Sequence, residues 1–153
     1  MDNITSQEAR DQLAVAQSAT VTTTHDRRVH GLATAGFGVA MGAYVAIQRA
    51  LDGTGAETPL LAVYAIALLG LVTWQTRAAR SVPRSSRLIG YVGLAGSFVL
   101  MMATIMWLNV RSTGRLGGVE GQPESWGILL LAGVVIALPM LVAGARILRG
   151  GAK

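Results

Sequence analysis

Two histidines and an aspartate near the start of the chain are the residues best suited to binding a metal ion. Imidazole nitrogens and carboxylate oxygens are common zinc ligands, and His25, Asp26 and His30 lie close together in the sequence. Residues five positions apart on a helix, however, are separated by about 140° around its axis, so His25 and His30 cannot face one point. We therefore predict no metal site and no bound cofactor.

Acid–base catalysis would need an acid or a histidine beside a second polar group. Only Asp26 with His30, and Glu120 with Glu124, offer a starting point. The sequence contains no nucleophile elbow, phosphate-binding loop or zinc-protease motif, and it has no cysteine for thiol chemistry. We predict that the protein is not an enzyme, and we keep an enzyme acting on lipid or envelope precursors as the least favoured alternative.

Arginine is concentrated in residues 77–87, which contain no acidic residue and lie between two long apolar segments. The four arginines are Arg77, Arg80, Arg84 and Arg87. Each arginine near an anionic membrane surface contributes about 1 kcal/mol of attraction, so we predict that these four contact anionic lipids.

Small residues one helical turn apart recur inside the apolar segments. These pairs are Gly38 and Gly42, Gly93 and Ser97, and Gly133 and Ala137. Such pairs let two helix backbones approach closely, which replaces the hydrophobic drive that helices lack in lipid. The six residues are therefore predicted to form helix-packing contacts, either within the chain or in a homo-oligomer.

Four apolar segments must position these residues, and they span about residues 31–51, 59–75, 88–109 and 126–145. As helices, segments of this length can cross a hydrocarbon core of about 30 Å. The chain is 52% hydrophobic and only 14% charged, whereas soluble domains are about 25% charged. We predict an all-α protein whose residues 31–149 form an integral membrane antiparallel four-helix bundle.

The distribution of Lys and Arg predicts the orientation of the segments. If both termini are cytoplasmic, ten of the thirteen basic residues lie on the cytoplasmic side, and only Arg49, Arg111 and Arg115 lie outside. This bias strongly favours the N-in, C-in arrangement in the cell membrane, the inner membrane of a bacterium. The basic residues cluster at the ends of apolar segments, so they indicate membrane orientation rather than binding to nucleic acid.

Residues 1–30 are predicted to form a cytoplasmic N-terminal helix. Thr5 and Glu8 fit a capping box, and Ala9, Leu13, Ala16 and Thr20 then recur at helical spacing. This helix either ends before the first apolar segment or runs on into it. Because its apolar stripe is thin, it needs a partner surface or the membrane interface to persist.

Local signals add three expectations about helix ends and contacts. Thr58 is predicted to cap the second apolar helix, with Pro59 in its first turn, and Ser85 or Ser86 to cap the third. Tyr44 and Tyr64 should lie at similar depth in adjacent helices, so we expect them to touch.

A small channel or transporter subunit is the second functional alternative. It would need a water-accessible line of polar residues, for which Thr34, Tyr44 and Ser97 are the candidates. Residues 59–76, 88–110 and 125–145 contain no ionisable Asp, Glu, Lys, Arg or His, which argues against a proton- or cation-coupled carrier.

The arrangement resembles small four-span membrane proteins of high-GC Gram-positive bacteria. The resemblance lies in the leader Glu8-Ala-Arg-Asp-Gln-Leu13, then Asp26-Arg-Arg28, ahead of a glycine-rich first segment. It implies an accessory or regulated membrane component and supplies no active site. We therefore expect a non-enzymatic interaction protein that acts through helix packing, with membrane lipids and a second copy or another membrane protein as partners.

Overall fold

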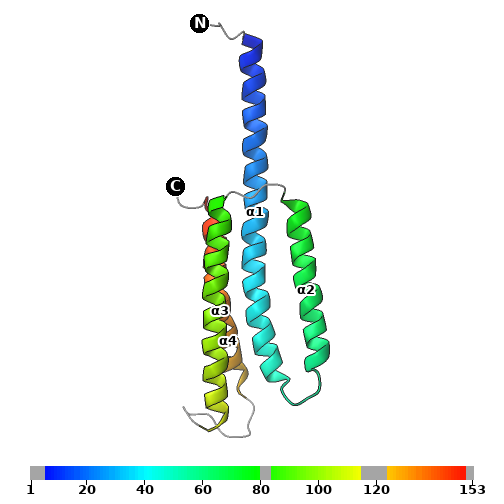
Figure 1. Ribbon diagram of the computed structural model, residues 1–153, viewed down its shortest axis with the longest axis vertical. Coiled ribbons are helices and arrows are strands. Elements are labelled where there is room, and N and C mark those ends of the chain that lie inside the picture. Colours follow the sequence, from blue (N-terminus) through cyan, green and yellow to red (C-terminus); the bar gives the residue numbers. More distant parts are fainter. Residues whose placement is uncertain (1–5, 80–83, 115–123, 151–153) are drawn as a thin grey trace.

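The computed structural model describes residues 6–79, 84–114 and 124–150, and within these ranges the protein is all-helical, with no strand. The four helices are α1 (Ser6–Ala50), α2 (Glu57–Ala78), α3 (Arg84–Ser112) and α4 (Trp126–Leu148). Successive helices run in opposite directions (Figure 1). Each contains a stretch long enough and apolar enough to cross a membrane, as the sequence predicted.

Helix α1 is continuous from Ser6 to Ala50, so its N-terminal half runs on into the first apolar segment without a break. At 1.5 Å per residue its 45 residues rise by about 68 Å, roughly twice the thickness of a hydrocarbon core. Its first turns project well beyond the other three helices (Figure 1). The predicted capping box depends on Thr5, which lies outside the described residues.

The predicted caps of α2 and α3 are wrong. Helix α2 begins at Glu57, and the residue before it, Ala56, makes no side-chain capping bond, so Thr58 lies inside the first turn. The reason is the preceding turn, where Gly53 has a φ of 75° and its amide donates to the Glu57 carboxylate at 3.0 Å. Helix α3 begins at Arg84, which likewise places Ser85 and Ser86 inside its first turn.

The closest packing joins α1 to α4, because small residues on both helices face each other. A β-carbon on Gly42 would overlap the Gly133 carbonyl oxygen, and one on Gly144 would lie 2.6 Å from the Gly31 carbonyl oxygen. Gly38 meets the same helix, since a β-carbon there would lie 2.7 Å from that of Met140. The glycines therefore let the two backbones approach so closely that no side chain would fit between them. Such close approach increases dispersion, which is a main attraction between helices in lipid.

Helix α3 packs on the other side of α4. A β-carbon on Gly93 would lie 2.6 Å from the β-carbon of Ala143 and 3.3 Å from the Pro139 carbonyl oxygen. Ser97, one turn further along α3, is fully buried. Helices α1, α3 and α4 therefore form a compact group around the small residues of α4.

Helix α2 stands apart from this group. Among the described residues it contacts α1 alone, and none of its own residues is buried. The expected contact between Tyr44 and Tyr64 is confirmed, with stacked rings whose centroids lie 4.3 Å apart. Gly70, the only glycine of α2, faces open space, so no close backbone contact draws α2 further in. The described helices thus form a three-helix group with one peripheral helix, which is looser than the predicted four-helix bundle.

Candidate functional site

A cleft of about 520 Å³ lies between α1, α2 and α3, with Met140 of α4 at its inner wall. Its lining residues lie toward the end of the helices where Arg27, Arg77, Arg87 and Arg146 lie, which we call the arginine end. Its polar lining comes mainly from His30, Thr34, Gln75 and Arg87. Its apolar lining comes mainly from Phe37, Tyr91, Leu94 and Met140.

A hydrogen bond between His30 and Gln75 connects α1 to α2 across the cleft. The Gln75 amide nitrogen lies 2.7 Å from His30 Nδ1, and because an amide NH₂ group can only donate, Nδ1 accepts. In the neutral imidazole the proton then resides on Nε2. Thr34 does not compete for the ring, since its hydroxyl donates to the His30 carbonyl oxygen at 2.8 Å.

His30 Nε2 has almost no accessible surface and makes no hydrogen bond, so the tautomer set by Gln75 leaves a buried donor within the wall of the cleft. The Ser86 backbone of α3 interacts with the ring, but outside the geometry of a normal hydrogen bond to Nε2. Gly90 lies opposite, and a β-carbon there would be 3.6 Å from Nε2, so the absence of a side chain leaves room beside the ring. A buried donor without a hydrogen bond costs about 1–3 kcal/mol.

The four arginines predicted to contact anionic lipid do not share one site. Arg87 is exposed and lines the cleft. Arg77 lies in a shallow hollow on α2 with Trp74 and Ile66, away from the cleft. Arg84 is exposed in the first turn of α3, and Arg80 lies outside the described residues.

The six small residues predicted as packing or oligomer contacts are all accounted for inside the chain. Gly38 and Gly42 face α4, and Gly93 faces α4 from the other side. Ser97, Gly133 and Ala137 are buried. These surfaces are therefore covered within a single chain.

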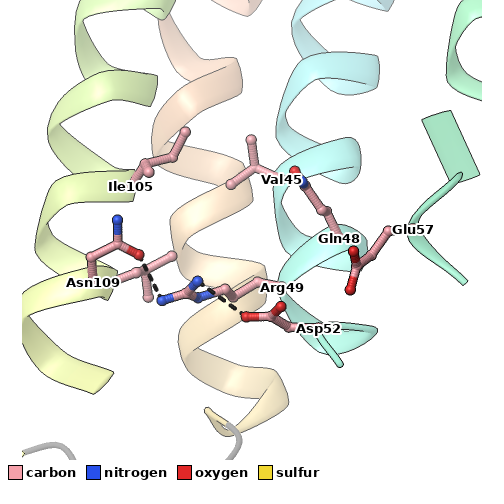
Figure 2. Close-up of a pocket in the computed structure, with 8 residues that line it drawn as sticks. Val45, Gln48, Arg49, Asp52, Glu57, Ile105 and Asn109 are labelled. Carbon is pink, nitrogen blue, oxygen red and sulfur yellow. Dashed lines mark hydrogen bonds and ion pairs between the residues drawn. The ribbon is translucent and has the colours of Figure 1, made fainter. Parts of the chain in front are cut away.

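A second, smaller pocket of about 280 Å³ lies at the opposite end of the helices, which we call the loop end (Figure 2). Arg49 is its central group. Its guanidinium donates to Asn109 of α3 at 2.8 Å and forms an ion pair with Asp52 at 3.3 Å. The hydrogen bond from Arg49 to Asn109 therefore links the end of α1 to α3.

The residues suited by type to catalysis or metal binding remain separate. Asp26 is buried one turn before His30, and Glu124 is paired with Arg111 at 3.0 Å, while Glu120 lies outside the described residues. No group of three His, Asp or Glu side chains comes together in the described part of the chain.

The polar line needed by a channel is not assembled in the described residues. Thr34 lines the cleft, Tyr44 is stacked on Tyr64, and Ser97 is fully buried with an unbonded hydroxyl. No described cavity is lined by two of the three.

Sequence reasoning missed the bonds from His30 to Gln75 and from Arg49 to Asn109. Each polar residue was visible at the edge of an apolar segment, which is an available signal for a polar partner on another helix. The partner itself could not be identified, because no local pattern states which helices are neighbours at a given depth.

Comparisons with protein-family models, with curated proteins and with solved structures gave no match. In the part of the chain that the structure describes, the fold is all-helical, and four helices are long and apolar enough to cross a membrane.

Proposed function

We propose that this chain is a multi-pass integral membrane protein with both ends in the cytoplasm, acting as a non-enzymatic interaction component. The observation that supports membrane insertion is helix α2, which is apolar over most of its length and buries none of its residues. Leu61, Ile66 and Leu69 are more than half exposed. Apolar surface left in water forgoes about 25 cal/mol per Å² of stabilisation, whereas lipid solvates it without that loss.

The ends of the helices support the orientation. The end of α2, the start of α3 and the end of α4 lie together at the arginine end (Figure 1). Exposed aromatic rings lie near both ends, with Trp74 and Tyr91 toward the arginine end and Trp126 at the loop end. Amphipathic rings favour the two membrane interfaces, and arginine favours the cytoplasmic one.

Cysteine labelling in whole cells tests this orientation, because the natural chain has no cysteine of its own. We expect a membrane-impermeant maleimide to label Thr113→Cys in intact cells and to label Ala14→Cys and Ser85→Cys only after lysis. All three positions are exposed, so folding does not shield them. Labelling of Ala14→Cys in intact cells would exclude a cytoplasmic N-terminus.

The projecting part of α1 is the surface that we propose for interaction, and a second copy of the chain is its occupant. Ala9, Leu13, Ala16 and Thr20 are spaced by four, three and four residues, the spacing of a coiled-coil seam. Only the side chain of Leu13 is described among them, and it is 61% exposed. Two copies inserted in one membrane hold their α1 helices parallel, which is the geometry that such a seam requires.

The mass of the purified protein in mild detergent tests self-association. We expect wild type to be a dimer and Leu13→Glu to weaken dimerisation at least about tenfold, since a buried leucine contributes about 1.5–3 kcal/mol. Ala14→Glu is the matched control, because it introduces the same charge one position off the seam. A wild-type protein that is strictly monomeric, or equal effects of the two substitutions, would exclude the seam.

A further inference from the structure

We propose that the cleft between α1, α2 and α3 binds the headgroup of an anionic phospholipid from the cytoplasmic leaflet. The headgroup phosphate lies against Arg87, and the first part of an acyl chain follows the apolar wall. This inference rests on the proposed membrane insertion and adds a specific ligand class.

The polar groups of the cleft are suited to a phosphate. Arg87 supplies a permanently charged donor to the lining. The Gln75 amide adds a neutral donor, because it has a second N–H beside the one that bonds His30 Nδ1. Phosphate oxygens accept from both donor types, and arginine–phosphate contacts are among the stronger hydrogen bonds in proteins.

The cleft changes from polar to apolar along its depth, as a lipid does. Arg87 and His30 lie at the arginine end, where the proposed topology places the cytoplasmic headgroups. Phe37, two turns further along α1 than His30, and Leu94, one turn beyond Gly90, line the deeper part. A volume of about 520 Å³ falls within the usual range of about 300–1,000 Å³ for ligand sites.

The side of the cleft between α2 and α3 gives access from the bilayer. In the described part of the chain α2 contacts α1 alone, so no helix-to-helix contact closes that side. A phospholipid could therefore enter laterally, with its headgroup in the cleft and its remaining tail in the surrounding bilayer.

The charged groups around the cleft are compatible with an anion. Arg87 is the charged residue in its lining. Asp26, one turn before His30, is buried and does not line the cleft. Arg77 lies in the separate hollow on α2, and Arg84 lies one turn from Arg87 without lining the cleft.

Native mass spectrometry of the full-length protein, purified in mild detergent and delipidated, tests the proposal by titration with phosphatidylglycerol or phosphatidylcholine. We expect tighter binding of phosphatidylglycerol. Arg87→Gln should weaken that binding about fivefold, the effect of losing one arginine near anionic lipid. Arg84→Gln is the matched control in the same turn of α3 and should weaken binding clearly less than Arg87→Gln, because Arg84 does not line the cleft. Gly90→Leu should abolish binding by filling the space beside His30.

Three outcomes would overturn the proposal. Equal weakening by Arg84→Gln and Arg87→Gln would indicate diffuse attraction to the arginine-rich segment. Equal binding of phosphatidylglycerol and phosphatidylcholine would exclude a preference for an anionic headgroup. Binding of inorganic phosphate alone, lost in Arg87→Gln and displacing the lipid, would make a free phosphate the ligand. Circular dichroism confirms that each variant is folded, and the labelling of Thr113→Cys tests membrane insertion separately, so the two proposals can fail independently.

Discussion

Replacing Gly42 by valine is expected to destabilise the fold severely. Even a β-carbon at Gly42 would overlap the Gly133 carbonyl oxygen, and a backbone oxygen cannot rotate away as a side chain can. Overpacking commonly costs about 1–3 kcal/mol, and this contact involves two backbones, so we expect a loss of at least about 3 kcal/mol. That is a large share of a typical stability of about 5–15 kcal/mol.

Gly70→Val is the matched control for that substitution, because Gly70 also lies within an apolar helix but faces open space. We expect it to change the free energy of unfolding by less than about 1 kcal/mol, since valine has a somewhat higher helix propensity than glycine. Reversible unfolding in mixed micelles, followed by circular dichroism, measures both variants. Equal stabilities for Gly42→Val and Gly70→Val would show that α1 and α4 are not in close contact.

Removing the ion pair between Arg111 and Glu124 is expected to have the next largest effect on stability after Gly42→Val. This ion pair joins the last turns of α3 to the residues just before α4, at the loop end. Both Glu124 carboxylate oxygens lie 3.0 Å from Arg111 Nε. Their side chains are only 19% and 11% exposed. Fully exposed pairs contribute about 0–1 kcal/mol and breaking a buried pair costs about 3–5 kcal/mol, so we expect Glu124→Ala to cost about 1–3 kcal/mol.

A double-mutant cycle isolates the contribution of this pair. We expect Arg111→Ala and Glu124→Ala to be non-additive by about 1 kcal/mol or more, because each single variant already removes the ion pair between the two residues. Arg49 with Asp52 is the comparison pair, since Asp52 is 66% exposed and its loss should cost less than about 1 kcal/mol. Strict additivity for Arg111 and Glu124 would contradict the ion pair, whatever the size of the single effects.

Much of the fold was predictable from the sequence, because its determinants are local. An apolar segment bounded by charge, glycine and proline defines a helix within itself, so the four segments were located to within a turn or so at most ends. The contact of Tyr44 with Tyr64 was also predictable, since equal distances from a short connection place two residues at equal depth. The small pairs were recognisable as packing positions by their spacing of one turn.

The caps were less predictable because they depend on the geometry of the preceding turn. Thr58 is a favourable capping residue by type, yet the Gly53 turn brings Glu57 into position first, and the helix starts before Thr58. The glycines of this turn, Gly53 and Gly55, are visible in the sequence. The direction of the Glu57 side chain, however, depends on the backbone angles of the whole turn, which residue types alone do not specify.

By itself, the sequence determined the number of apolar helices, their extents and the end at which arginine gathers, because each follows from residues adjacent in the chain. Only the tertiary structure decided that the glycines of α1 pack against α4, that α2 remains peripheral, and that His30 of α1 meets Gln75 of α2. Those outcomes depend on how each helix is rotated about its axis, and that rotation is set by side chains far apart in the sequence that compete for the same contact.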